Sequence, residues 1–133
     1  MRSDTVLFAL CDIRDNILLV QEFVAGHVPE SFAASRLHVY AAARALEIIS
    51  EASRRLPADL RARHPQLPRR AIRDAGNFYR HQYDNVAESY VWETVWEHLP
   101  DRAPVERLTR AFVYAAMAGA PASHFFSNCI GLR

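Results

Sequence analysis

The feature that most constrains the fold of this chain is the spacing of its apolar residues. In the first part of the chain they recur at intervals of three or four: Leu7, Leu10, Ile13, Ile17, Val20 and Val24. This spacing places them on one side of an α-helix and does not fit the alternation of a half-buried strand. Gly26 follows, and glycine commonly ends a helix in the left-handed conformation. We therefore expect a helix over residues 4–25.

Similar periodic runs, separated by prolines, continue along most of the chain. They predict a short helix over 57–63 and four longer ones over 32–56, 69–83, 87–99 and 104–117. Only 4 of the 133 residues are glycine, which favours helices over turn-rich β structure. We expect an all-α fold, an antiparallel up-and-down bundle of four to five helices. The expected core positions of the second long helix are Leu37, Tyr40, Ala41, Ala45, Ile48, Ile49 and Ala52.

The length of the chain fits a single domain with a real hydrophobic core. The helical pattern fills residues 1–117, which we take as the domain. The remaining residues, 118–133, carry little periodicity, and we assign that tail no role. We expect no membrane span, because charged residues interrupt every apolar run well before the roughly 18 residues that a span requires.

Charge and cysteine content exclude some classes of function. The formal net charge is +1, so no protein-wide basic field attracts nucleic acid, and any such binding has to be local. Cys11 and Cys129 lie far apart without the spacing of metal ligands, and we expect no metal or other cofactor. With no secretory segment evident, we expect a reduced, cytoplasmic protein.

Polar and titratable side chains are most concentrated in the stretch from Arg73 to Asp84, which covers most of the expected helix over 69–83. Arg73, Asn77 and Arg80 fall in one row on a helical wheel. His81 lies about 40° from the direction of Asn77 on the same wheel. The helix thus offers two guanidinium groups, an amide and an imidazole to one patch.

This patch suits a phosphodiester substrate. Arginine binds phosphate through a planar fork, and histidine can transfer a proton near neutral pH. No serine or cysteine nucleophile stands beside these residues in the sequence. The alternative is that the row is only the solvated face of a helix, which is the usual meaning of a polar stripe.

A second polar row lies on the expected helix over 32–56. Arg44, Glu47 and Glu51 follow one another at intervals of three and four residues. They could form an exposed ion-pair ladder, worth about 0.3–0.5 kcal/mol per pair. They could instead support a phosphate site, with Glu47 orienting an arginine or a histidine.

The first helix carries more apolar width than one core contact requires. Leu18, Leu19 and Phe23 extend its apolar face. Extra hydrophobic surface of this kind marks contact with another molecule. We therefore expect a homodimer that buries apolar surface of the first and the central helix.

Three blocks of the chain, residues 41–68, 71–86 and 91–100, resemble the HepT-like branch of the HEPN superfamily, bacterial and archaeal helical-bundle proteins paired with a nucleotidyltransferase antitoxin. The first block contains Leu-Glu-Ile-Ile-x-Glu-Ala and an Arg-His-Pro-x-x-Pro connector, and the second contains His81-x-Tyr83. In order and spacing the resemblance covers about residues 4–110.

The resemblance implies a toxin that is a metal-independent endoribonuclease, works as a dimer and is neutralised by its nucleotidyltransferase. The family motif is an arginine, four to six residues, then His-x-Tyr. His81 and Tyr83 match its last two residues, and Asn77 matches the polar residue that commonly follows the arginine. Four, five or six intervening residues would place the arginine at Gly76, Ala75 or Asp74, so the arginine itself does not match, and Arg73 or Arg80 could supply the guanidinium instead. Arg44 and Glu47 become supporting site residues.

The resemblance also implies a means of control, in which the nucleotidyltransferase adds AMP to the tyrosine of the motif, here Tyr83. Two other functions remain open. One is a catalytically inactive regulatory subunit of a nucleotidyltransferase complex, because the motif arginine is displaced. The other is a structural dimer module.

Overall fold

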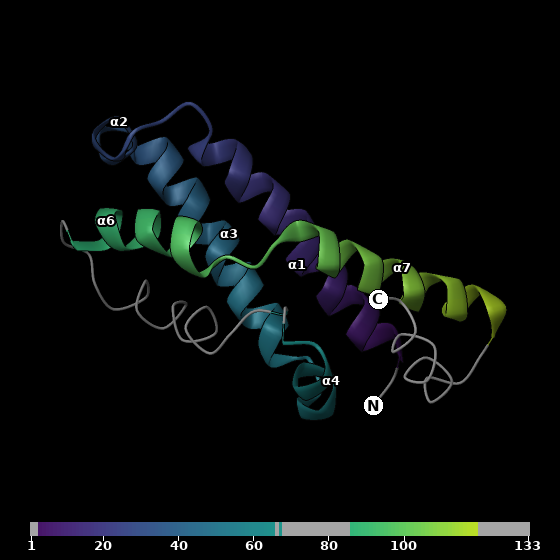
Figure 1. Cartoon of the computed structure of the whole chain (residues 1–133). Coiled ribbons are helices and arrows are strands. Elements are labelled where there is room, and N and C mark those ends of the chain that lie inside the picture. Colours follow the sequence, from purple (N-terminus) through teal and green to yellow (C-terminus); the bar gives the residue numbers. More distant parts are fainter. Residues whose placement is uncertain (1–2, 66, 68–85, 120–133) are drawn as a thin grey trace.

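The computed structural model describes residues 3–65, 67 and 86–119, and every regular element in that part is helical (Figure 1). The elements are α1 (Ser3–Val24), α2 (Pro29–Ala34), α3 (Arg36–Arg54), α4 (Ala58–Arg63), α6 (Val86–Glu93), the π-helix η1 (Thr94–His98) and α7 (Arg102–Ala118). The all-α prediction is confirmed. The predicted helix over 69–83 lies outside the described residues, as does nearly all of the tail.

Helix α1 is the centre of the fold, since it packs along both α3 and α7. Figure 1 shows α1 and α3 running side by side in opposite directions. α6 crosses the end where α2 meets α3, and α7 continues along the first half of α1. The helix predicted over 4–25 is confirmed, and Gly26 follows its end with a φ of +76°. Without a Cβ, glycine adopts that left-handed conformation at little cost.

The core lies between α1, α3, α6 and α7. On α1 the core takes Leu10, Ile13, Ile17, Val20 and Val24, as the spacing of apolar residues predicts, together with Val6 and Ala9. On α7 it takes Val105, Leu108 and Phe112. On α3 it takes Val39, Ala42, Ala45, Leu46, Ile49 and Ala52. Small residues on α3 let α1 approach closely. The contacts of α1 with α3 and of α1 with α7 therefore share one apolar layer.

The predicted helix over 32–56 is wrong in one respect, because it is two helices. Ser35 interrupts it in an extended conformation, with φ −105° and ψ 96°. Its hydroxyl lies 2.6 Å from Nδ1 of His38. At the other end of α2, the Ser31 hydroxyl accepts a hydrogen bond from the Val28 backbone N–H at 3.0 Å. The short helix thus starts before residue 32, and it buries the ring of Phe32 completely.

The predicted core of α3 is also wrong at its start. Leu37 and Tyr40 are 76% and 68% exposed. Val39 and Ala42 are buried in their place. The buried face is therefore rotated from the one expected, because α1 packs against the side of α3 that carries small residues. Leu37 and Tyr40 are left on an outer face that no described helix covers.

The helix predicted over 87–99 starts as α6 and changes its winding at Thr94. From Thr94 to His98 the backbone is a π-helix. The buried Thr94 donates a side-chain hydrogen bond to the Tyr90 carbonyl oxygen at 2.7 Å. The predicted short helix over 57–63 is confirmed as α4, and the one over 104–117 as α7.

Candidate functional site

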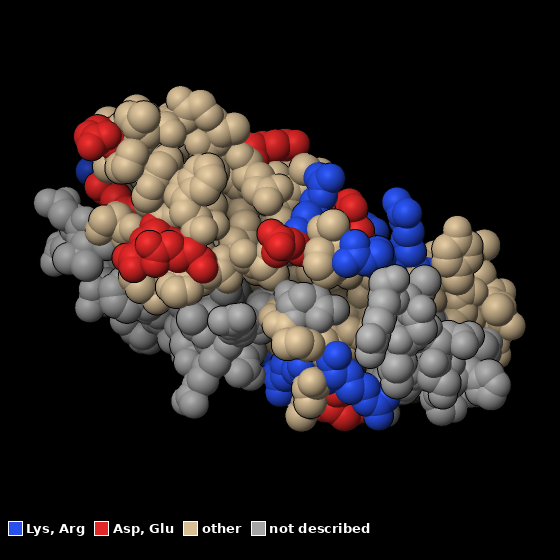
Figure 2. Space-filling view, viewed as in Figure 1, with Lys and Arg blue, Asp and Glu red and all other residues tan. Residues whose placement is uncertain are grey.

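Charged side chains are unevenly distributed over the described surface. Figure 2 shows acidic groups gathered over α6 and arginines gathered over α4 and α7. The arginines on the latter two helices are Arg61, Arg63, Arg102, Arg107 and Arg110. The net charge near zero thus conceals local fields of opposite sign, and the basic regions are the ones that suit an anion.

The five residues expected to carry the chemistry lie outside the described residues. They are Arg73, Asn77, Arg80, His81 and Tyr83. Their mutual geometry therefore stays a prediction. Of the expected site, only the supporting pair Arg44 and Glu47 has a described position.

Arg44 and Glu47 form an ion pair on α3, with 3.2 Å between Nη1 and Oε2. The Arg44 side chain is 71% exposed and that of Glu47 is 24% exposed. At this exposure the pair contributes at most about 0.5 kcal/mol to stability. The guanidinium remains accessible to a phosphate or to a partner.

The pair belongs to a longer series of charges on the outer side of α3. Glu51 bonds to Arg54 at 3.2 Å, and Arg55 reaches across to Asp12 of α1 at 2.6 Å. Between these groups lies a shallow groove of about 390 Å³, lined by Arg44, Glu47, Ile48, Glu51 and Arg55. Of the predicted ladder, the pair of Arg44 with Glu47 is present, whereas Glu51 pairs with Arg54, which was not part of the prediction.

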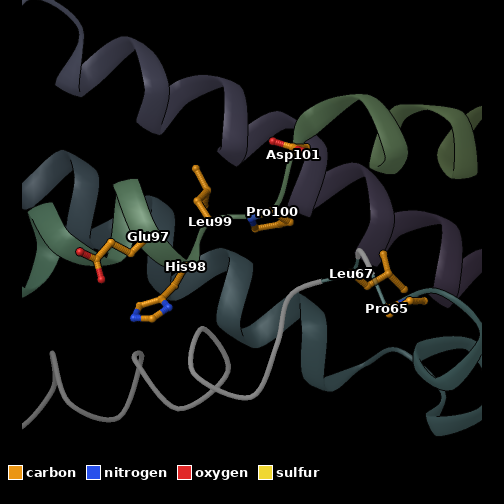
Figure 3. A pocket seen from close by; sticks show the side chains of 7 residues that line it. All are labelled: Pro65, Leu67, Glu97, His98, Leu99, Pro100 and Asp101. Atoms are coloured by element: carbon orange, nitrogen blue, oxygen red, sulfur yellow. The ribbon is translucent and has the colours of Figure 1, made fainter.

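A second hollow, of about 290 Å³, lies where the segment after α4 meets the turn between η1 and α7 (Figure 3). Pro65 and Leu67 form one side, and Glu97 and His98 lie at the other. Asp101 adds a further carboxylate. An imidazole and two carboxylates around one hollow can exchange protons or bind a cation.

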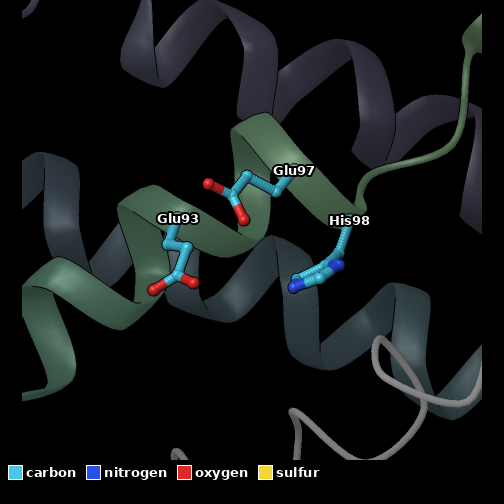
Figure 4. A group of neighbouring side chains, drawn as sticks. All are labelled: Glu93, Glu97 and His98. Carbon is cyan, nitrogen blue, oxygen red and sulfur yellow. The ribbon is translucent and has the colours of Figure 1, made fainter.

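Glu97 and His98 also belong to a group that includes Glu93 (Figure 4). One potential ligand atom from each of the three side chains lies within 4.8 Å of the others. The wider turn of the π-helix explains this, because i and i+5 come to lie nearly above one another. All three side chains are exposed, and exposed carboxylates alone do not define a metal centre. Sequence reasoning missed the group, and the sequence Glu-x-x-x-Glu-His is the signal that could have suggested it.

The environment of His64, at the end of α4, favours its neutral form. Partial burial lowers the pKa of this imidazole, and the positive charge of Arg63 lowers it further. The folded chain consequently binds fewer protons at this position than the unfolded chain, in which a histidine has a pKa of about 6.5. The contribution of His64 to the free energy of unfolding is therefore fully present above about pH 6.5, and it is lost as the pH is lowered below that value.

We expect His64→Gln to weaken this acid sensitivity. Urea unfolding at pH 7.5, 6.5 and 5.5 measures it, since the difference in unfolding free energy between pH 7.5 and 5.5 should be smaller in the variant than in the wild type. An unchanged or larger difference would contradict the assignment to His64.

The described part of the chain defines an all-α domain with exposed arginine clusters and a charged groove on α3. No helix in that part is both long and apolar enough to cross a bilayer. The family model named Ribonuclease HepT-like matches residues 13–106. The chain belongs to the HepT-like ribonuclease family.

The names of similar proteins agree with this membership. The chain is 36% identical over 89 residues to a protein of Thermococcus cleftensis named "Probable ribonuclease HepT", covering 67% of this chain and 81% of that protein. It is 30% identical over 95 residues to a candidate RNase of Methanocaldococcus jannaschii, covering 71% and 76%. A candidate RNase of Caldanaerobacter subterraneus is 32% identical over 80 residues, covering 60% and 71%. No solved structure matches the chain significantly.

Proposed function

We propose that this protein is a metal-independent endoribonuclease, the toxin of a toxin–antitoxin pair, and that a nucleotidyltransferase neutralises it. The observation that carries the proposal is the family match over residues 13–106, which includes His81 and Tyr83. The names of the relatives, which describe RNases, support the class of substrate.

In the proposed reaction His81 removes the proton from the 2′-hydroxyl of a ribose. The 2′-oxygen then attacks the neighbouring phosphorus, and the bond from phosphorus to the 5′-oxygen breaks. A 2′,3′-cyclic phosphate and a 5′-hydroxyl result, once an acid protonates the departing oxygen. General acid–base catalysis of this kind typically contributes 10²- to 10⁴-fold to a rate.

The arginines have the second role, which is to stabilise negative charge on the phosphorane. Arg80 or Arg73 supplies the guanidinium that the motif arginine would otherwise provide, and Asn77 donates a further hydrogen bond. Arg44 is the described contributor, since its guanidinium is exposed beside the groove. Glu47, bonded to Arg44, keeps it at the edge of the groove.

RNA cleavage by the purified protein tests the proposal. In the presence of a chelator the wild type should cut RNA to products with 2′,3′-cyclic phosphate ends. His81→Ala should reduce the rate by roughly 10²- to 10⁴-fold. His38→Ala is the matched control, because His38 belongs to the junction of α2 and α3, and it should cleave as the wild type does.

Two results would count against the proposal. One is cleavage that persists in His81→Ala, and the other is cleavage that requires a metal ion. A folded wild type that cuts no RNA would favour the regulatory subunit instead, because none of the positions that the motif allows for its arginine, Asp74, Ala75 and Gly76, holds one.

A further inference from the structure

The side of α7 that lies opposite its core contacts carries two arginines and a tyrosine. On a helical wheel Arg107, Arg110 and Tyr114 point within about 60° of one another. The buried residues of the same helix point the other way: Val105, Leu108 and Phe112. Tyr114 is 71% exposed, and both arginines are exposed as well. We call Arg107, Arg110 and Tyr114 the α7 stripe.

The α7 stripe keeps its positive charge. From Arg107 to Ala118 the helix holds two arginines and no aspartate or glutamate. The acidic residue of α7, Glu106, is bonded to Arg102 at 3.3 Å. Within the part of the chain that the structure describes, neither Arg107 nor Arg110 is paired with a carboxylate. The stripe therefore attracts anions, and Figure 2 shows arginines gathered over this helix.

The groove on α3 differs from the α7 stripe in this respect. Arg44 is paired there with Glu47, and Arg55 is paired with Asp12. A phosphate at that groove has to compete with these carboxylates, whereas a phosphate at the α7 stripe meets guanidinium groups alone. Of the two surfaces, the α7 stripe is the better suited to bind a polyanion.

The tyrosine adds a chemical preference that charge alone does not give. Every base has a flat face that stacks on an aromatic ring, so exposed rings beside basic groups bind unpaired nucleic acid with little regard to its sequence. Guanidinium groups bind phosphates of the same strand through two parallel hydrogen bonds. Met117, one turn beyond Tyr114, is 81% exposed and extends the apolar surface against which a base can lie. This combination favours a single strand over a duplex, whose bases are already stacked on one another.

The core holds α7 in place beneath the stripe. Leu108 and Phe112 are 5% and 4% exposed, and α7 packs along α1. The hydroxyl of the buried Thr109 donates a hydrogen bond to the Val105 carbonyl oxygen at 2.7 Å, so burial leaves it satisfied. A packed helix fixes the spacing of the side chains on its outer face, which reduces the entropy that is lost when a ligand binds.

We propose that the α7 stripe binds single-stranded RNA, with Arg107 and Arg110 on its phosphates and Tyr114 stacked on one of its bases. Arg107 and Tyr114 are two turns apart, so their positions differ by about 10 Å along the helix axis. A strand that runs along α7 therefore contacts all three side chains at once.

This inference rests on the proposed function for one point, the choice of RNA as the polyanion. It adds a second contact with the substrate, because the stripe lies beyond residues 13–106, which the family model matches. Neither arginine nor tyrosine exchanges a proton readily near neutral pH. The stripe therefore holds the strand and takes no part in breaking it.

Fluorescence anisotropy with an uncleavable probe tests the arginines. The probe is a fluorescein-labelled single strand of about 12 nucleotides, within the range of known site sizes, and its riboses are 2′-O-methylated so that no 2′-hydroxyl is present to attack. At about 0.1 M salt, Arg107→Gln and Arg110→Gln should each raise the Kd roughly fivefold. Each should also lower the slope of log Kd against log salt concentration by about 0.7, because one phosphate contact is lost.

Two substitutions of Tyr114 test the stacking. Tyr114→Ala should raise the Kd by about 5- to 100-fold and leave the salt dependence unchanged, because stacking on a base releases no counterion. Tyr114→Phe should bind as the wild type does, since it keeps the ring. With a 2′-O-methylated duplex of the same length, Tyr114→Ala should have no effect, because paired bases offer the ring no free face.

Matched controls remove a charge and a ring elsewhere. Arg36→Gln removes an exposed arginine at the start of α3, which lies beside α2 at the end of the molecule away from α7 (Figure 1). Trp96→Ala removes a ring that is 61% exposed on η1, where Glu93 and Glu97 repel phosphate. Both should leave the Kd unchanged, and circular dichroism checks that every variant remains helical.

Three results would overturn the proposal. They are a wild type that does not bind the probe, unchanged binding in the variants of Arg107 and Arg110, and a loss in those variants with none in Tyr114→Ala. The last would indicate an anion site without base stacking, as an acidic protein partner would use. Because the probe cannot be cut, tight binding by a protein that cleaves no RNA would refute the proposed function alone. Cleavage by a wild type whose stripe variants bind normally would refute the stripe alone.

Discussion

Replacing Phe32 by alanine is expected to lower the free energy of unfolding by about 3–5 kcal/mol. The ring is fully buried, and it is the only buried side chain of α2. It packs on the ring of Trp92 from α6, with 5.3 Å between the ring centroids. Removing it leaves a cavity and takes away the anchor that holds α2 to the end of the bundle.

Urea unfolding followed by tryptophan fluorescence and by circular dichroism measures this effect, since Trp92 reports on the site directly. Phe8→Ala is the matched control. The ring of Phe8, on α1, is 65% exposed, and its loss should change the free energy of unfolding by no more than about 0.5 kcal/mol. Equal costs for the two variants would show that Phe32 does not anchor α2.

The importance of Phe32 is an example of what the sequence could not supply. Periodicity predicts a helix well where apolar residues recur without a break, as they do along α1. At Ser35 the break comes from the bonds of hydroxyls and a histidine ring, and it leaves little trace in the apolar pattern. The apolar pattern predicts one helix over residues 32–56, so it does not show that Phe32 belongs to a helix of its own, α2, and anchors it.

The face that α3 buries was not predictable for a related reason. Leu37, Tyr40 and Ile48 are as apolar as the residues that α3 does bury, so a wheel alone favours them as core. The structure buries the alanine side because close approach to α1 rewards small side chains. The larger apolar residues are thereby left outside, where they meet the charges of Arg44 and Glu51.

Some parts of the candidate site could be predicted from the sequence, and others could not. The pairing of Arg44 with Glu47 follows from a spacing of three residues, and the structure confirms it. The grouping of Glu93 with His98 needs the π-helix, because an ordinary α-helix turns residues five apart well away from each other. The roles of His81 and Tyr83 rest on the family motif, because both residues lie outside the part of the chain that the structure describes.

We expect Tyr83 to be the residue that the nucleotidyltransferase modifies. Co-expression of this protein with the nucleotidyltransferase of a neighbouring gene should raise its intact mass by that of one or more adenylyl groups. The transfer joins the phosphorus of AMP to the tyrosine oxygen, releases pyrophosphate from ATP and frees the phenolic proton. Tyr83→Phe removes the acceptor oxygen and should abolish the increment completely.

The negative charge of the added AMP is the physical reason why modification should inhibit the protein. Tyr83 follows His81 by two residues and Arg80 by three, so an added phosphate brings negative charge to the groups proposed to bind an RNA phosphate. Modification should therefore suppress RNA cleavage along with the change in mass. Tyr79→Phe is the matched control, because it removes a hydroxyl from the same stretch and should still acquire AMP. An increment that survives in Tyr83→Phe would place the modification at another residue, and cleavage that continues in fully modified protein would separate the modification from inhibition.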